Sequence, residues 1–240
     1  MTLKGKRVAV IGGTSGIGLA IAQASLDAGA AVTIASRRPA SVDAAAARLG
    51  PGATGATVDV LDAASVAKAL GTGDGPVDHL IYTAGEPLTM MPVAGLDLGR
   101  AQEFFSVRYF GALNTVHAAL PYLAPQASIT LTSGTAGDRA GSGWALGASV
   151  CGAVNSLIRA LAVELAPVRV NAVAPGVLRS GVWAEMSEPD RERMYDQIGH
   201  ALPLGRVGEP GDAAEAYLYC MQQAYTTGAV IPVDGGTLLV

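Results

Sequence analysis

The chain has few of the residues that build metal centres or disulfide frameworks. Its 240 residues include only two cysteines and three histidines. Cys151 and Cys220 lie far apart and match no metal-binding spacing, so we expect free thiols in a reducing, cytoplasmic compartment. The three histidines (His79, His117 and His200) are equally scattered, and the sequence therefore predicts no metal site.

Charge and long apolar runs are also scarce. Only 15% of the residues are charged and the net charge is −4, which argues against nucleic acid as the main partner. No uninterrupted apolar run reaches about 18 residues, the length that predicts a membrane-spanning helix. The opening segment MTLKGKRVAV leads directly into an apolar run, so we expect no signal peptide. Because half of the residues are hydrophobic, residues 1–240 are expected to form one sizeable domain.

Glycine, in contrast, is abundant, and its most informative cluster lies near the start. The segment VAVIGGTSGIG joins an apolar run at residues 8–11 to an amphipathic stretch at residues 19–28. Glycines permit the tight turn between such a strand and helix, and they let the backbone approach a pyrophosphate. The free N–H groups of the new helix then favour negative charge. We therefore predict a dinucleotide site that includes Gly12, Thr14, Ser15, Gly16, Ile17 and Gly18.

Apolar runs alternate with helical stretches along the rest of the chain. This alternation predicts an α/β fold with one doubly wound parallel sheet of about seven strands and helices on both faces. The expected strands cover residues 8–11, 30–36, 55–60, 79–85, 128–132, 168–176 and 229–236. Two longer helices are each expected to bury one apolar face. These faces comprise Phe105, Tyr109, Ala112, Val116 and Leu120 on the first helix, and Val150, Val154, Leu157, Leu161 and Leu165 on the second.

The longest irregular segment covers residues 177–208. Ser187, with Asp190 three positions later, predicts the start of a helix inside it. One interpretation is a surface excursion with its own small core. The other is a substrate lid, because the segment leaves the carboxyl end of a strand, where open α/β sheets bind ligands. We favour the lid.

Several short motifs resemble those of the short-chain dehydrogenase/reductase (SDR) family over essentially the full length of the chain. The family's Gly-xxx-Gly-x-Gly pattern falls on Gly12, Gly16 and Gly18, with Ile11 in place of the usual Thr. The other matching motifs are VDV around Asp59, Ala84-Gly85, Pro175-Gly176 with Ser180, GRVGEP at 205–210 and VDGG at 233–236. The resemblance implies a Rossmann fold and an NAD(P)-dependent oxidoreductase.

The resemblance also implies roles for residues at the strand ends. It places Asp59 and Val60 at the adenine ring, and Ala84 and Gly85 along the cofactor. Ser180 would hold the nicotinamide amide. The segment Pro175, Gly176 and Val177 would border it. One departure is that Tyr82 and Thr83 stand where the family has two Asn residues before Ala-Gly.

The end of the second expected strand predicts which dinucleotide is bound. NAD-preferring relatives carry an acidic residue there, but this chain has Ser36 followed by Arg37 and Arg38. Two guanidinium groups are suited to clamping a ribose 2′-phosphate, and no carboxylate at this strand end repels it. A solvated charged pair at the start of a loop is the alternative. We expect NADP(H).

The family's proton-relay residues are missing. Aligned on the long helix, the Lys falls at Cys151 and the Tyr at Gly147, while the Ser falls at Gly134 and the helix Asn at Arg108. Residues 128–165 contain neither Tyr nor Lys that could replace them. In the family, Tyr donates the proton as hydride arrives, while Lys lowers the Tyr pKa and holds the cofactor ribose. Without them, reduction of simple ketones should be slow.

The replacements allow several interpretations. Ser133 is a neutral hydroxyl that either binds a substrate oxygen or caps a strand end. Arg108 either points into the site, toward an anionic substrate group or a cofactor phosphate, or is a helix-surface charge. These two are the candidate catalytic residues. Trp144 and Trp183 are the candidate substrate-pocket residues, with core packing as the alternative, and Cys151 is interpreted as a small buried hydrophobe.

The sequence therefore predicts an NADP(H)-dependent oxidoreductase that acts on a small molecule with low demand for acid catalysis, such as an iminium, an enone or a quinone-like ring. A scaffold repurposed for a non-redox cyclisation or isomerisation remains an alternative, as does a non-catalytic NADP-binding protein. Retention of Ser180 favours the redox enzyme, and loss of the relay favours the others. The resemblance further implies a homo-oligomer, dimer or tetramer, through the two long helices and the last strand.

Overall fold

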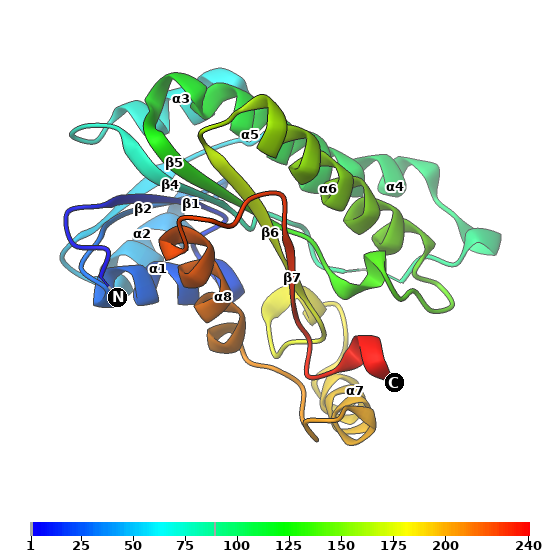
Figure 1. The fold of residues 1–240 in the computed structure, drawn as a ribbon. Helices are drawn as coiled ribbons and strands as arrows, with labels where there is room; N and C mark the ends of the chain where they lie inside the picture. The colour runs from blue at the N-terminus through cyan, green and yellow to red at the C-terminus, as the bar shows by residue number, and fades with distance from the viewer. Residues whose placement is uncertain (1, 89) are drawn as a thin grey trace.

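The computed structural model of the protein describes residues 2–88 and 90–240. Its centre is a seven-stranded sheet in the order β3-β2-β1-β4-β5-β6-β7 (Figure 1). Every neighbouring pair is parallel. The chain starts in the middle with β1, winds outward to β3, and then returns to β4 and winds the other way. The predicted doubly wound sheet is confirmed.

The elements follow one another in the alternating order expected from the sequence. The strands are β1 (Arg7–Ile11), β2 (Ala31–Ser36), β3 (Ala53–Thr57), β4 (Val77–Tyr82), β5 (Leu123–Thr132), β6 (Arg169–Pro175) and β7 (Val230–Val233). The α-helices are α1 (Gly16–Asp27), α2 (Pro39–Leu49), α3 (Ala63–Gly71), α4 (Leu98–Phe105), α5 (Gly111–Ala119), α6 (Ala145–Glu164), α7 (Glu188–Ala201) and α8 (Pro210–Gln222).

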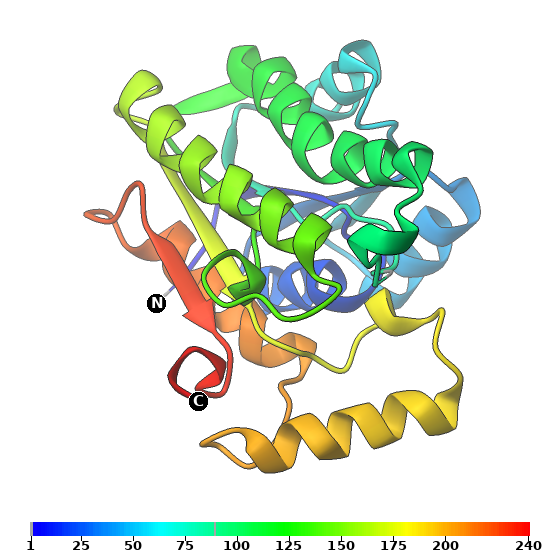
Figure 2. The same ribbon diagram turned by 90° about the vertical axis from the view of Figure 1, so that its right-hand side faces the viewer.

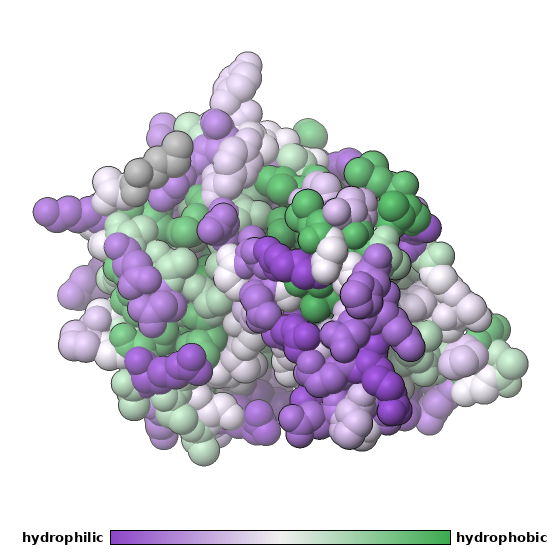
Figure 3. Space-filling view, turned by 90° about the horizontal axis from the view of Figure 1, so that it is seen from below, coloured by the Kyte–Doolittle hydropathy of each residue, from purple (hydrophilic) through white to green (hydrophobic). Residues whose placement is uncertain are grey.

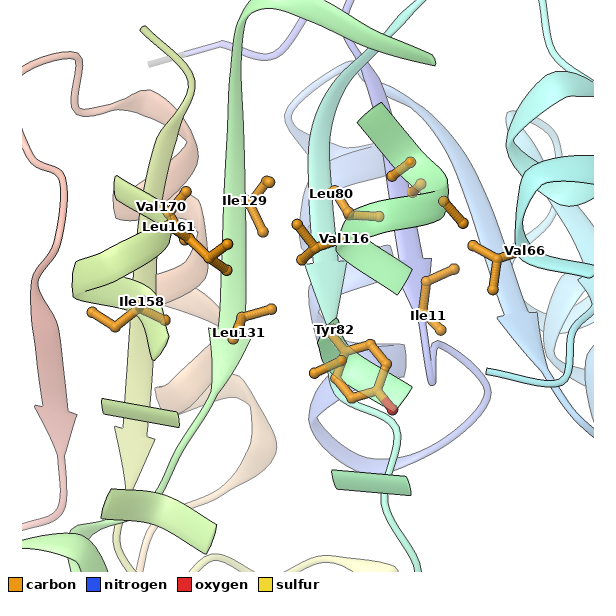
Figure 4. Close-up of a cluster of buried hydrophobic side chains, with 14 of the residues drawn as sticks. Ile11, Val66, Leu80, Tyr82, Val116, Ile129, Leu131, Ile158, Leu161 and Val170 are labelled. Atoms are coloured by element: carbon orange, nitrogen blue, oxygen red, sulfur yellow. The ribbon is translucent and has the colours of Figure 1, made fainter. Parts of the chain in front are cut away.

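Helices cover both faces of the sheet and form a separate apolar core on each. Helices α3, α5 and α6 lie on one face, and α1, α2 and α8 lie on the other (Figures 1 and 2). Figure 4 shows part of the first core, in which Val116 and Ile158 from the helices meet Leu80 and Ile129 from the strands. The two cores clamp the central strands, which fixes the positions of their carboxyl ends.

The third strand ends earlier than predicted. We expected residues 55–60, but β3 covers Ala53–Thr57. It is an edge strand whose residues are mostly exposed, so it lacks the apolar alternation on which the prediction depended. The consequence is that Asp59 and Val60 lie beyond the strand, in the turn before α3.

The first long helical stretch is not one continuous α-helix. A π-helical turn at Ser106–Phe110 separates α4 from α5, and the Gly111 amide donates to the Ser106 carbonyl, five residues earlier. The side chains that α4 and α5 bury include Phe104, Ala112 and Val116. The predicted face was therefore partly wrong, since Phe105 and Tyr109 are only half-buried and Leu120 is exposed.

Helix α6 is the one described helix that is long and apolar enough to cross a membrane by length and composition alone. In this fold it lies along the sheet and buries one face. That face consists of Val150, Val154, Ile158 and Leu161, whereas the predicted Leu157 and Leu165 are half-buried at its border. Core helices of soluble proteins commonly pass the same test, so the helix is weak evidence for a membrane span.

The segment 177–208 forms a small substructure beside the strand ends. Its helix α7 is capped as predicted, with the Ser187 side chain accepting from the Asp190 amide. Trp183 and Tyr195 form its own apolar cluster together with Val207. Figure 3, which views the molecule from the side of α7, shows polar side chains gathered there. The segment thus turns an apolar side inward and a charged side to solvent.

A buried histidine between β4 and β5 generates a testable prediction. His79 Nδ1 lies 2.8 Å from Ser128 Oγ. Burial lowers the pKa of His79 from its usual 6.5 to about 4. Between these two pH values His79 binds a proton in the unfolded chain but not in the native state. The free energy of unfolding therefore falls as the pH drops through that window.

We expect wild type to lose about 2–3 kcal/mol of unfolding free energy from this group as the pH falls through that window. Urea denaturation at several pH values would measure it. His79→Asn should remove this part of the pH dependence, although it weakens the fold at neutral pH. His117→Asn, at an exposed position, is the matched control and should keep the wild-type slope. An unchanged slope in His79→Asn would refute the assignment.

Candidate functional site

The glycine turn after β1 packs directly on the end of β4. Gly12 has φ +95°, and a Cβ there would lie 2.5 Å from the Ala84 amide nitrogen. Thr83, one of the two departures from the family's Asn pair, donates its hydroxyl to the Gly12 carbonyl at 3.2 Å. No side chain fits at Gly12, so the backbone of the glycine turn packs directly against the β4 exit.

The start of α1 has the properties of a phosphate site. Ser15 is the N-cap residue but makes no side-chain cap, and the first turn carries no acidic residue. A Cβ on Gly16 would meet only the Ser180 Cβ, at 3.7 Å. No side chain therefore caps the amides of the first turn, which include those of Ile17 and Gly18. These residues fit the pyrophosphate of a dinucleotide.

The end of β2 carries the two arginines, with a carboxylate that sequence reasoning missed. Ser36 is half-buried, while Arg37 and Arg38 are exposed. Arg37 Nη2 lies 3.4 Å from Glu86 Oε1, so a carboxylate from the β4 exit reaches this position. The sequence feature that could have indicated this contact is that Glu86 directly follows Ala84-Gly85, at the same edge of the sheet as the β2 exit. The pair is exposed and hence weak.

The turn after β3 borders the same edge. Asp59 is exposed and accepts the Leu61 amide at 2.9 Å. The Val60 carbonyl accepts a hydrogen bond from Asn114 of α5 at 2.8 Å. The segment is thereby fixed to the helix that continues from the π turn.

The end of β6 is fixed against β7 and opens into the 177–208 segment. The Gly176 amide donates to the Val233 carbonyl at 3.0 Å, and a Cβ on Gly176 would lie 2.9 Å from Asp234 Cα. Beyond Pro175-Gly176, the Val177 carbonyl accepts the Gly208 amide at 3.1 Å, which closes the segment at its base. Ser180 follows, facing the glycine turn through Gly16.

Two of the positions aligned with the missing relay are neighbours. A Cβ on Gly134 would lie 3.1 Å from Cys151 Sγ, whereas one on Gly147 would meet only the Trp144 ring, at 3.4 Å. Burial raises the pKa of the Cys151 thiol, and the nearby Arg108 guanidinium opposes this shift. A buried thiol with a raised pKa stays protonated at neutral pH, which makes it a poor nucleophile.

The Ser133 hydroxyl is held by helix α6. It donates to Asn155 Oδ1 at 2.6 Å, and the Ser133 amide donates to the Val173 carbonyl at 2.8 Å. Asn155 is a site residue that sequence reasoning missed. The signal was a polar side chain one turn beyond Cys151 on an otherwise apolar helix face.

Arg108 lies inside the fold, in the π turn between α4 and α5. Its Nη2 donates to the Glu86 carbonyl, and its guanidinium lies 4.6 Å from the centre of the Phe104 ring. A Cβ on Gly85 would lie 2.7 Å from Nη1, so this glycine makes room for the arginine. The Arg108 Nε is buried and has no hydrogen-bond partner.

The two tryptophans pack against each other where the 177–208 segment meets α6. Their ring centres are 6.1 Å apart, with an angle of 74° between the planes. Trp183 is buried and donates its Nε1 hydrogen to the Leu178 carbonyl at 3.1 Å. Trp144 is half-buried beside Gly147. The structure thus puts Trp183 in a small core and leaves part of Trp144 accessible.

Comparisons with known proteins agree with this fold. A family model described as an SDR-like Rossmann domain matches residues 2–240. The short-chain dehydrogenase/reductase malC of Malbranchea aurantiaca is 33% identical over 99% of this chain and 96% of its own length. The short-chain dehydrogenase/reductase ucsE of an Acremonium species is 38% identical over 99% of this chain and 97% of its own.

Solved structures give the same result. The structure of the MalC reductase/Diels-Alderase superposes with a TM-score of 0.92 at 33% identity, covering 99% of this chain and 98% of that chain. The NADPH-bound short chain oxidoreductase from Pseudomonas aeruginosa, which contains an atypical catalytic center, gives 0.89 at 32% identity, with 97% and 96% covered. The chain belongs to the short-chain dehydrogenase/reductase family.

Proposed function

We propose that the protein is an NADP(H)-dependent oxidoreductase that transfers hydride to or from a small organic substrate. The observation that carries the proposal is the pair Arg37 and Arg38 at the β2 exit, beside a glycine turn whose helix amides are open. NADPH bound to the P. aeruginosa relative supports it. When bound, the dinucleotide supplies the hydride, and the protein supplies binding and orientation.

In this proposal the cofactor lies along the carboxyl edge of the sheet. Its pyrophosphate binds the amides at the start of α1, and its adenine lies against Asp59 and Val60. Its nicotinamide amide is held by Ser180. The remaining contacts are made by Gly12, Thr14, Ala84, Gly85, Pro175, Gly176 and Val177.

The ribose 2′-phosphate would be held at the start of α2. Arg38 is the N-cap residue there and makes no side-chain cap, and Pro39 provides no N–H at the first position. Arg37 must exchange its weak pairing with Glu86 for the phosphate, whose greater charge and bidentate geometry favour the exchange.

Cofactor preference tests this proposal. We expect wild type to bind NADPH more tightly than NADH. Arg37→Ala should weaken NADPH about 10- to 100-fold while leaving NADH nearly unchanged, because only NADPH carries the 2′-phosphate. Glu86→Gln is the matched control at the same pair and should bind NADPH at least as tightly as wild type. Fluorescence titration measures both affinities, and equal affinities insensitive to Arg37→Ala would refute the proposal.

The substrate should need little acid catalysis. Gly147 and Cys151 supply no phenol and no ammonium, and the Ser133 proton is engaged by Asn155. An iminium, an enone or a quinone-like ring accepts hydride without prior protonation by the enzyme. Ser133 and Arg108 are the polar side chains beside these positions, and neither replaces the missing tyrosine as a proton donor.

We propose that residues 177–208 form the lid of this single-domain enzyme. The segment begins at the β6 exit, encloses its own apolar cluster, and contacts the β4 exit where the Leu88 amide donates to the Val182 carbonyl at 2.8 Å. Trp144 supports a flat substrate from the α6 side, and Trp183 supports the lid from within. The lid would exclude water during hydride transfer.

An NADPH-oxidation screen tests the substrate class. We expect negligible turnover of simple ketones and measurable turnover of at least one cyclic imine, enone or quinone, because general acid catalysis is worth about 10²- to 10⁴-fold. The double variant Gly147→Tyr/Cys151→Lys should gain little, since Arg108 and Gly134 still differ from the family pattern. Brisk ketone reduction would show that another group supplies the proton.

A non-redox activity is the second candidate. The observation that favours it is the similarity to MalC, a reductase/Diels-Alderase, together with the missing relay residues. In that case the same site would fold a substrate for cyclisation or isomerisation, with NADP(H) structural or absent. Tight NADPH binding without oxidation by any substrate class would favour this candidate.

We further propose a homo-oligomer, dimer or tetramer, that uses the outer faces of α4 to α6 and the last strand. Val163 on α6 is 82% exposed and Leu98 on α4 is 63% exposed. Between these helices lies an apolar hollow of about 680 Å³, lined in part by Phe105 and Phe110. Apolar surface of this kind is typical of subunit interfaces.

Light scattering at micromolar concentration tests this assembly and should give the mass of a dimer or tetramer. Val163→Lys should shift the equilibrium toward monomers, because it places a charge in the interface. Arg159→Lys, on an exposed position of the same helix, is the control and should not. A wild-type monomer would contradict the proposal.

We place the protein in the cytoplasm. Cys151 and Cys220 are both free, and the fold is an SDR-like Rossmann domain. Free thiols are typical of a reducing compartment.

A further inference from the structure

The order of the strands indicates what the middle of the bound dinucleotide must cross. The proposed phosphate site lies at the exit of β1, where Ser180 of the 177–208 segment also lies, because a Cβ on Gly16 would be 3.7 Å from the Ser180 Cβ. The positions aligned with the proton relay, Gly134 and Cys151, lie at the β5 exit and mark the nicotinamide end. Strand β4 lies between β1 and β5 in the sheet, so the nicotinamide ribose would cross the β4 exit.

Arg108 is the cation at that crossing. Its guanidinium packs against Gly85, at the β4 exit, and its charge influences Cys151 of α6, which lies beside Gly134 at the β5 exit. Cys151 itself is the position at which the family pattern has its lysine. A positive charge is thus present next to that position, but it comes from the π turn instead of α6.

The hydrogen bonding of Arg108 is incomplete. Its Nη2 donates to the Glu86 carbonyl, and its Nε is buried without a partner. The Glu86 carboxylate pairs with Arg37 instead, so no ion pair neutralises Arg108 among the residues that the structure describes. Arg108 is thus a half-buried cation without an ion-pair partner in the described part of the chain, and its one hydrogen bond to a described residue uses Nη2, so the Nη1 hydrogens remain for the acceptor oxygens of a bound ligand.

We propose that Arg108 binds the nicotinamide ribose hydroxyls and thereby takes over the cofactor-holding role of the missing lysine. This inference rests on the proposed NADP(H) function. The planar guanidinium presents several N–H donors in a fixed fork, which suits two neighbouring hydroxyl oxygens. The π turn is what brings Arg108 into the site, and Gly85 is small enough to admit it.

Both dinucleotides carry this ribose, so Arg108 should affect them equally. We expect Arg108→Gln to weaken NADPH and NADH by a similar factor, about 10- to 100-fold, because a charged donor is lost. Arg37→Ala, in contrast, should affect NADPH alone. General damage to the fold would also weaken both dinucleotides, so melting curves and a rescue variant with the positive charge on α6 are what separate the two explanations.

A second variant tests whether a positive charge on α6 can replace that of Arg108. In the double variant Arg108→Gln/Cys151→Lys, an ammonium returns to the family position, and we expect most of the lost affinity for both dinucleotides to be recovered. Cys151→Lys alone is the control. It places two cations side by side, so it should lower the melting temperature and not improve binding. Arg108→Lys, which keeps the charge but not the fork, should lie between wild type and Arg108→Gln.

Fluorescence or calorimetric titration without substrate, with melting curves for every variant, separates the outcomes. Unchanged affinity for both dinucleotides in a folded Arg108→Gln would overturn the inference, and a raised KM for substrate alone would assign Arg108 to a substrate anion instead. Should Arg108→Gln fail to fold, Arg108→Lys and the double variant carry the same test. Wild type that binds neither dinucleotide would instead overturn the proposed function itself.

Discussion

The contact between the glycine turn and the end of β4 is the constraint on which the rest of the site depends. The Gly12 backbone approaches Ala84 so closely that no Cβ fits, and Thr83 bonds back to the Gly12 carbonyl. This contact sets the height of the first helical turn of α1 relative to the β4 exit. The same contact positions the residues that follow β4, including Gly85 and Glu86, relative to the proposed phosphate site. The apolar cores on both faces then hold β1 and β4 in register.

The positively charged side chains around this contact are arranged differently from the family pattern. The long helix α6 brings Cys151, an uncharged thiol, to the position of the lysine, while the π turn brings in Arg108. The two changes are compatible with each other. A lysine at position 151 beside Arg108 would place two cations close enough to repel, and the loss of both would leave the site without a positive charge. The Glu86 carbonyl accepts from Arg108 while its carboxylate reaches Arg37, so one residue links both cationic positions.

Local patterns were sufficient to predict the parts of this arrangement that depend on neighbouring residues. The glycine turn, the alternation of strands and helices, and the Ser187 cap all arise from short-range geometry. The end of β3 was misplaced because an edge strand has little apolar pattern. The π turn was missed because no short motif marks it, and in the fold it packs against α6, which lies far away in the sequence. The contacts Arg37–Glu86 and Ser133–Asn155 join residues far apart in the chain, which no spacing in one sequence reveals.

Residues 177–208, which we propose as a lid, contact the strand ends at two points. Ser180 faces Gly16 across the glycine turn, and the Leu88 and Val182 backbones bond directly, so the base of the segment touches both the β1 and β4 exits. Trp183 is fixed by its bond to the Leu178 carbonyl and leans edge-on against Trp144 of the α6 side. Any opening of the segment must therefore separate two aromatic rings above Gly147. Because glycine there leaves the ring of Trp144 as the nearest wall, the loss of the family's tyrosine exchanges a proton donor for apolar space. That exchange supports the proposed flat substrate, which would be recognised by its shape more than by hydrogen bonds to a polar group.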